Sequence, residues 1–477
     1  MVEFPSIISE ENPREALIEK QPAVHEERNE RPEDVPIYGF FYLGVVGLLC
    51  YNFFLQVIGL LAERTRQNFV TTATFVYAVS NNVGQLICIF TGPYLSMNLR
   101  ICFSCALIFV VSLGYPLVVN SDVPLGFHTG IGLTFALGFG NAVFQSAGFG
   151  LAAMMGERAL NFMSFGQSFA GLVVWPSLLL LKLIISRVRG AVAMAPDSEI
   201  TGLPPVVDTN TWPVILGFVL VAILTVVTIP YYLIWFSRNT VIYRALQGDP
   251  AHPSRTDADT SRRGVWMIIW KTLPLALTVW FLLFVTFLVF PGVVLSWEPT
   301  LGFFLNHRNT YSEILIYTFQ VFDAVGKLLA LVGLRLSSFQ VRMVTPWRLA
   351  WAVLFFAAGA GVAVLRCDVV RIGLIAVLAI TNGLLITWCM IWGPGQVRRS
   401  EREVAGYVMS FFLVFGITCG TLAAMFLNSL RDIQPVLEQG GTEMKMLVLN
   451  GDLEHLVDEW NMPHYPARIY NPLSIPK

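Results

Sequence analysis

The chain has 477 residues, of which 55% are hydrophobic and 13% are charged, and its mean hydropathy is +0.63. Soluble domains carry about a quarter charged residues, so this composition excludes an ordinary soluble protein and indicates a polytopic membrane protein in a lipid bilayer. The net charge of −1 gives no reason to expect a nucleic-acid partner.

The amino-terminal segment 1–36 is polar and charged. It has no apolar core of the kind found in cleavable signal peptides. We therefore expect a cytoplasmic tail here, with the first spanning helix acting as the insertion signal.

Apolar stretches long enough to cross a bilayer follow one another along the chain. A spanning helix needs about 20 apolar residues. By this criterion the sequence predicts an all-α protein with eleven transmembrane helices, near 37–61, 70–95, 100–119, 127–155, 159–185, 212–236, 265–295, 311–334, 344–365, 371–395 and 403–429.

The distribution of basic residues predicts the orientation. Cytoplasmic connections of membrane proteins are enriched in Lys and Arg. The connections that would share a side with the amino terminus carry most of the arginines: Arg100, Arg158, Arg238, Arg244, Arg255, Arg262, Arg263, Arg335, Arg342, Arg348, Arg398, Arg399 and Arg402. We expect a cytoplasmic amino terminus, an extracellular or lumenal carboxyl terminus, and residence in the plasma membrane.

A long polar break at 237–264 divides the membrane region into a six-helix bundle at 37–236 and a five-helix bundle at 265–430. A basic cytoplasmic loop between two helical halves is the arrangement of major-facilitator-like transporters. Here the second half would have one helix fewer. The polar segment 431–477 would form an extracellular or lumenal tail.

Amide side chains recur within the predicted spans. Asn141 and Gln145 lie one turn apart in a glycine-rich stretch, and Gly166 and Gln167 repeat the scheme in the next span. Single amides often join membrane helices by hydrogen bonds. Their recurrence in several spans also suits a shared polar cavity for a neutral polar solute.

Two opposite charges lie within the eighth predicted span. Asp323 and Lys327 are four residues apart and share a helix face, with Gln320 one turn earlier. Charges at the centre of a bilayer are costly, so they usually face the protein interior or water. The pair could simply join two helices, or it could line a transport pathway, where its net neutrality would favour an uncharged substrate.

The remaining chemistry-bearing residues do not indicate an enzyme. The seven cysteines are scattered; Cys102 and Cys105 have the C-x-x-C spacing, but both lie inside an apolar span without a partner pair. The six histidines fall in loops, tails or helix ends. An acyltransferase-like membrane enzyme would need an acid-base or metal set within the spans. We expect no cofactor and no metal.

Five motifs together resemble the equilibrative nucleoside transporter family (solute carrier family 29 type). They are "NAVFQSAGFGLA" in span 4, "MSFGQSFAG" in span 5, "FPGVV" at 290–294, "FDAVGK" in span 8, and "TNGLLITWCMIWGP" followed by "EREVAGYVMSFFLVFGITCG". The resemblance covers about 38–430. It implies an eleven-span, major-facilitator-like transporter that works by alternating access.

The resemblance also implies roles for individual residues. Asp323 and Lys327 would meet the sugar of a nucleoside, Gln145 would bind the base, and Gln320 would lie beside the charged pair. Gly166 would keep two helices close. The other expected lining residues are Leu48, Tyr51, Leu55, Asn141, Phe290 and Ile417.

The chain departs from the family pattern at three of these positions. Lys327 replaces the usual Arg, Cys50–Tyr51 replaces the mammalian Pro-Trp, and Asn141 replaces a glycine. The absence of an acid at Gly166 argues against the organic-cation branch.

The expected function is facilitative uniport of purine nucleosides such as adenosine or inosine. Proton-coupled symport, transport of a nucleobase or another neutral solute, and a solute sensor remain alternatives. The sequence leaves the oligomeric state open, with a monomer as the working expectation.

Overall fold

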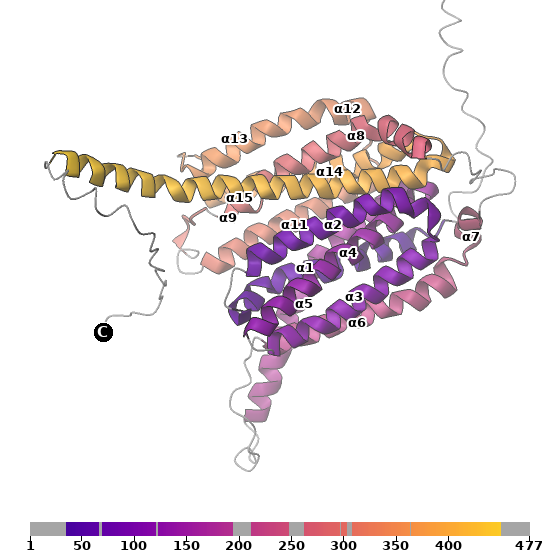
Figure 1. Cartoon of the computed structure of the whole chain (residues 1–477), viewed down its shortest axis with the longest axis horizontal. Helices are drawn as coiled ribbons and strands as arrows, with labels where there is room; N and C mark the ends of the chain where they lie inside the picture. The colour runs from indigo at the N-terminus through magenta and orange to yellow at the C-terminus, as the bar shows by residue number, and fades with distance from the viewer. Residues whose placement is uncertain are drawn as a thin grey trace, which may run out of the picture.

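The computed structural model describes residues 35–65, 69–120, 123–193, 211–247, 262–295, 297–302, 308–362 and 364–449. All regular secondary structure in these ranges is helical, and the long helices run side by side as one bundle (Figure 1). This confirms the predicted fold class.

The part of the chain before the central loop forms six long helices, which we call the N-terminal half: α1 (Ile37–Thr65), α2 (Phe69–Thr91), α3 (Met97–Asn120), α4 (Val123–Met155), α5 (Glu157–Ala193) and α6 (Thr211–Pro230). A 3-10 turn, η1 (Gly92–Tyr94), follows α2, and a π-helical segment, η2 (Tyr231–Phe236), extends α6. A short helix, α7 (Thr240–Gln247), lies in the segment expected to be only a loop.

The helices after the central loop form what we call the C-terminal half: α8 (Arg262–Val289), α9 (Gly292–Leu295), α11 (Arg308–Val332), α12 (Ser338–Val344), η3 (Thr345–Trp347), α13 (Arg348–Gly359), α14 (Asp368–Gly395), η4 (Arg399–Glu401) and α15 (Arg402–Leu449). Helix α12, η3 and α13 follow one another directly and together make one span. Helix α15 continues to Leu449, into the segment expected to be the polar tail.

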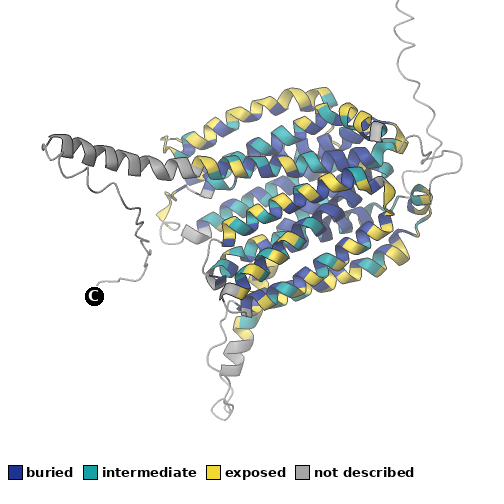
Figure 2. Ribbon diagram, in the orientation of Figure 1, coloured by how far each residue is buried: buried dark blue, intermediate teal, exposed yellow. Residues whose placement is uncertain are grey.

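Ten described helical segments are long and apolar enough to cross a membrane, and α4 lies in the bundle beside them. Helix α4 is less apolar because glycines and amides interrupt it. Its residues 140–153 are all buried, and it packs against α1, α2, α3, α5 and α15 (Figure 2). A helix that is covered by protein rather than lipid does not need a fully apolar surface. With α4 included, the described segments match the eleven predicted spans.

Small residues let α1 and α5 approach closely. A Cβ atom added at Gly166 would lie 2.2 Å from the carbonyl oxygen of Phe41, and one added at Gly44 would lie 2.3 Å from that of Met163. Any side chain at either position would force the two backbones apart. Gly166 therefore keeps α5 attached to α1, which is the close packing that small residues permit in membranes.

The two halves meet along two sets of helices. Helix α5 packs against α11 and α14 on one side of the bundle, and α15 packs against α2 and α4 on the other. Movement of one half relative to the other would change these contacts. Contacts within each half would be kept.

Candidate functional site

The predicted charge pair forms in the middle of α11. Lys327 Nζ lies 3.4 Å from Asp323 Oδ2, and each residue is only 8% exposed. The i,i+4 spacing on one helix places the two groups in reach of each other. The pair is close to electrically neutral as a unit, which lowers the cost of keeping it away from bulk water.

Two further side chains bind the carboxylate of Asp323, and they come from different halves. The amide of Asn382 on α14 donates to Oδ1 at 2.8 Å. The hydroxyl of Ser168 on α5 donates to Oδ2 at 2.5 Å. Hydrogen bonds of this length to a carboxylate are charge-assisted and strong.

The orientation of Asn382 is held by two donors to its side-chain oxygen. Thr286 Oγ1 lies 2.9 Å from Asn382 Oδ1, and Arg348 Nη2 lies 3.3 Å from it. Because that oxygen accepts from both, the amide nitrogen is left to face Asp323. Arg348 is 2% exposed and also donates to the carbonyl of Leu378 at 3.1 Å, so it belongs to the interior and not to the cytoplasmic connections where its position in the sequence placed it.

Glycines also bring α11 and α14 together beside the pair. A Cβ atom added at Gly326 would lie 2.1 Å from the carbonyl oxygen of Ile380, and one added at Gly383 would lie 2.1 Å from that of Asp323. The two helices therefore touch backbone to backbone at the level of the charges. This packing fixes Asp323 relative to Asn382.

A second polar group lies between α2 and α4 in the N-terminal half, and we call it the amide layer: Tyr77, Asn81, Gln85, Asn141, Gln145 and Ser146. Asn81 and Asn141 both donate to the hydroxyl of Tyr77, at 3.2 and 2.9 Å. The ring of Tyr77 stacks on that of Tyr51, with centroids 3.9 Å apart and planes 9° from parallel. Tyr51 of α1 is thereby joined to the amide layer.

Gln145 lies in the same layer. Its oxygen accepts from Gln85 Nε2 at 3.4 Å, and the oxygen of Gln85 accepts from Ser146 at 2.6 Å. Within the described residues the amide nitrogen of Gln145 has no partner. It remains available as a hydrogen-bond donor.

Helix α1 lies next to both polar groups. A Cβ atom at Gly171 of α5 would be 3.5 Å from the side-chain amide of Gln320 and 3.7 Å from Asn52 Oδ1. Gln320 is one turn from Asp323, and Asn52 follows Tyr51. This small residue thus lies between Gln320 of α11 and Asn52 of α1.

The remaining predicted lining residues differ in how far they are buried. Phe290 is buried and stacks on Phe319, one turn from Asp323, with centroids 4.2 Å apart. Leu48 and Ile417 are partly buried, and Leu55 is 38% exposed. A role of these residues in substrate binding stays a prediction.

A buried ion pair connects the two halves at one end of the bundle. Arg100, at the start of α3, donates to Glu403 of α15 at 2.7 Å and to the hydroxyl of Tyr407 at 2.5 Å. Tyr407 in turn donates to Glu403. The guanidinium also lies over the Tyr407 ring, 5.1 Å from its centroid.

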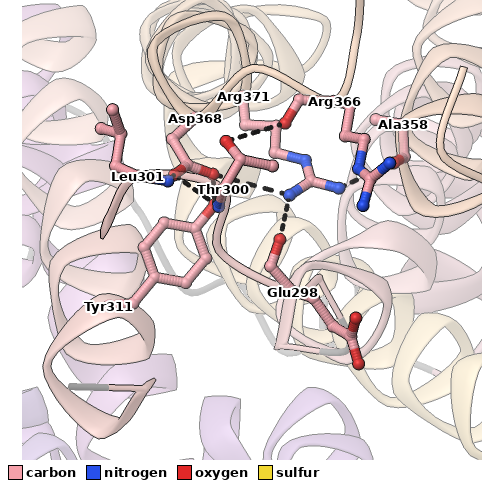
Figure 3. A network of polar contacts seen from close by, with 8 residues as sticks. All are labelled: Glu298, Thr300, Leu301, Tyr311, Ala358, Arg366, Asp368 and Arg371. Carbon is pink, nitrogen blue, oxygen red and sulfur yellow. Dashed lines mark hydrogen bonds and ion pairs between the residues drawn. The ribbon is translucent and has the colours of Figure 1, made fainter. Parts of the chain in front are cut away.

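At the opposite end a different network lies wholly within the C-terminal half (Figure 3). Asp368 accepts from the backbone of Thr300 and Leu301 at 2.8 and 2.7 Å and from Tyr311 at 2.9 Å. Arg371 lies 3.6 Å from Asp368 and donates to the carbonyls of Glu298 and Ala358 at 2.6 and 3.0 Å. The network ties the segment after α9 to the start of α14.

Sequence reasoning missed several polar partners: Tyr77, Ser146, Ser168, Thr286, Arg348 and Asn382. Ser168 and Asn382 lie inside motifs that the sequence singled out, so their positions in predicted spans were a usable signal. No such signal was present for Thr286. A threonine hydroxyl in a membrane helix usually donates to a backbone carbonyl of its own helix, as Thr286 also does to Leu282. Among the described residues, no group of three His, Cys, Asp or Glu side chains could hold a metal ion.

Comparison with known proteins agrees with this architecture. The family model "Nucleoside transporter" matches residues 214–429. Equilibrative nucleotide transporter 1 of Arabidopsis thaliana is 25% identical over 398 residues, covering 81% of this chain and 84% of that protein. Equilibrative nucleoside transporter 1 of Rattus norvegicus is 29% identical over 165 residues, covering 33% of this chain and 36% of that protein.

Among solved structures, the chain is similar to the E. coli fucose:proton symporter FucP, a major facilitator superfamily transporter. The TM-score is 0.53 for its outward conformation, with 14% identity, over 84% of this chain and 93% of that chain. At this identity the likeness concerns the fold alone. The motifs, the family model and the curated relatives together show that the chain is a multi-pass membrane transporter, not an enzyme, and that its sequence is similar to the equilibrative nucleoside transporters.

Proposed function

We propose that the protein carries nucleosides across its membrane by alternating access, as a uniporter, with purine nucleosides such as adenosine or inosine as its substrates. The family supports nucleoside transport in general. The observation that carries the proposal for this chain is the neutral Asp323–Lys327 pair, buried in α11 and bonded from both halves.

The chemistry of the pair suits the sugar of an uncharged nucleoside. An ionised carboxylate accepts hydrogen bonds, so Asp323 can bind ribose hydroxyls, while the ammonium of Lys327 has three donors and one partner among the described residues. Because the two charges offset each other, a neutral guest leaves the site neutral. A phosphorylated guest would bring negative charge that the neutral pair does not offset, and the nearby guanidinium of Arg348 already donates to Leu378 and Asn382.

The amide layer suits the base. Amide side chains provide both donors and acceptors, which match the edge of a purine, and the free nitrogen of Gln145 offers one such donor. Tyr51 provides an aromatic face at the same level. We place the base between the amide layer and α1, and the ribose toward α11.

Movement of the two halves would expose the site alternately to each side. The contacts that must change are those between halves, including the Arg100–Glu403 pair at one end. Contacts such as those around Asp368 and Arg371 stay within one half and need not change. The arrangement is therefore compatible with rocking of two rigid parts.

Uptake into proteoliposomes tests the proposal. The purified protein should take up labelled adenosine, and unlabelled inosine should compete more strongly than uridine. Hypoxanthine should compete weakly and glucose should not compete. Stronger competition by hypoxanthine would indicate that the substrate is a nucleobase, and stronger competition by glucose would indicate a sugar. Binding without uptake would indicate a sensor.

A pH jump separates uniport from proton symport. Asp323 is a carboxylate at the centre of the site, so it is the group that could carry a proton. Under uniport, an inward proton gradient leaves the initial rate of adenosine uptake unchanged. Accumulation of adenosine above equilibrium under that gradient would establish symport.

We propose that the protein is in the plasma membrane as a monomer, with a cytoplasmic amino terminus. The exposed arginines at one end of the bundle support this orientation: Arg238, Arg244, Arg335, Arg342, Arg398 and Arg399. A tag at the amino terminus should be protected from protease added to intact cells if this orientation is right. Digestion of the tag would show that the amino terminus lies outside the cell.

A further inference from the structure

One partner of the central carboxylate belongs to the opposite half of the molecule. Among the described residues, Asp323 is bound by Lys327 on its own helix, by Asn382 on α14 and by Ser168 on α5. The first two belong to the C-terminal half, as Asp323 does. Ser168 is the partner contributed by the N-terminal half.

Rocking of the halves would separate these partners unequally. Backbone contact at Gly326 and Gly383 keeps α14 against α11, so Asn382 would move together with Asp323. Backbone contact at Gly166 keeps α5 against α1, so Ser168 would move with the N-terminal half. The bond between Ser168 and Asp323 therefore forms when these helices close and breaks when they part.

A uniporter must return to the starting side without its substrate. During that return the site closes while it is empty, and a buried carboxylate oxygen that lacks one of its hydrogen-bond donors raises the free energy of the closed state, although Asn382 and Lys327 stay on Asp323. In this structure the hydroxyl of Ser168 supplies such a donor to Asp323 Oδ2 at 2.5 Å. A ribose hydroxyl has the same chemistry, one O–H donor directed at a carboxylate oxygen.

We propose that Ser168 takes the place of a substrate hydroxyl on Asp323 in the empty transporter and so permits the empty transporter to return. The loaded transporter closes with the substrate hydroxyl on the carboxylate, and the empty one closes with Ser168. This inference rests on the proposed function, since it assigns Asp323 to the substrate hydroxyl. It makes Ser168 a residue that determines the rate of one step, not a residue that binds the substrate.

Two modes of transport isolate the return step. Net uptake into empty proteoliposomes requires the empty transporter to return in each cycle, whereas exchange against internal unlabelled adenosine allows it to return loaded. Ser168→Ala removes the hydroxyl and keeps a good helix former. We expect the maximum rate of net uptake to fall at least about 10-fold, as for the loss of one hydrogen bond to a charged group, while the rate of exchange stays within about twofold.

Two further variants make the result specific. Ser168→Thr retains a hydroxyl at the same position and should restore much of the net uptake. Ser164→Ala is the control, because Ser164 lies one turn earlier on α5, is more deeply buried than Ser168 and has no hydrogen-bond partner among the described residues. It should leave both rates unchanged. Melting temperatures in detergent should show that the three variants are folded.

The outcomes separate the inference from the proposed function. Equal loss of net uptake and exchange in Ser168→Ala, or no loss in either, overturns the role of Ser168 while nucleoside transport by the wild type stands. If the wild type takes up no nucleoside, the proposed substrate fails instead. The ratio of exchange to net uptake is then measured with whichever neutral solute the wild type carries, and an unchanged ratio again overturns the inference.

Discussion

Arg100 and Arg371 are both buried arginines at the ends of the bundle, and both pair with an acid and contact an aromatic ring. Arg100 reaches across to the other half, where Glu403 and Tyr407 bind it. The partners of Arg371 all belong to its own half. The two networks therefore differ in role. The Arg100 network can separate when the two halves move apart, whereas the Arg371 network stabilises the C-terminal half.

The central carboxylate combines the two kinds of contact that these arginines make. Asp323 has partners of both kinds, a permanent one in Asn382 and a separable one in Ser168. A buried charge that keeps a partner within its own half remains compensated when the halves part. The comparison predicts that changes to contacts within a half mainly lower stability, whereas changes to contacts between halves mainly alter transport.

The largest effect is expected at the central pair. Asp323→Asn should reduce adenosine uptake at least about 20-fold, because the amide is a weaker acceptor for a hydroxyl and leaves Lys327 unpaired. The measurement is initial uptake in proteoliposomes, normalised to folded protein. Glu313→Gln, which changes a more exposed acid on the same helix and retains an oxygen that can accept from Trp175 of α5, should keep most of the uptake. Wild-type rates in Asp323→Asn would make the pair purely structural.

The next effect tests the network within one half. Asp368→Ala leaves Arg371 without its carboxylate and removes the acceptor for two backbone N–H groups. Loss of one partner of a buried pair costs about 3–5 kcal/mol, so the melting temperature in detergent should fall clearly. Glu298→Gln is the control, because Arg371 binds the backbone carbonyl of Glu298 while its carboxylate points away (Figure 3). Equal melting temperatures in both variants would contradict the stabilising role.

A smaller effect is expected in the amide layer. Gln145→Ala should raise the half-saturation concentration for adenosine about 3- to 10-fold, because the purine loses one hydrogen-bond donor. The maximum rate should change less. Uptake of adenosine and of uridine over a range of concentrations gives both parameters. An unchanged half-saturation concentration would remove Gln145 from the base site.

The smallest effect is expected between the halves. Tyr407→Phe keeps the ring beside Arg100 and removes the hydroxyl that binds both Arg100 and Glu403. Closure of this end becomes less favourable, so the maximum uptake rate should fall about two- to fivefold, with a smaller loss of melting temperature than in Asp368→Ala. A large loss of stability with unchanged uptake would break the distinction between the two ends.

Hydropathy and motif order were enough to predict the helices. The eleven predicted spans agree with the described helices because the bilayer requires both the length and the internal hydrogen bonding of each span. The pairing of Asp323 with Lys327 could also be predicted, because both residues are on one helix and the i,i+4 geometry is local. The extension of α15 and the presence of α7 were missed, since both lie in polar segments where hydropathy gives no signal.

Contacts between helices could not be predicted in the same way. Arg348 looked like a cytoplasmic loop residue, and only its position beside Asn382 shows that it belongs to the interior. In the sequence, Ser168 is one small polar residue among several in the predicted spans. Its hydrogen bond to Asp323 depends on the packing of α5 against α11. Local sequence determined which residues are helical and which charges can meet along one helix. Tertiary structure decided which of them meet across helices, because those distances depend on how whole helices pack.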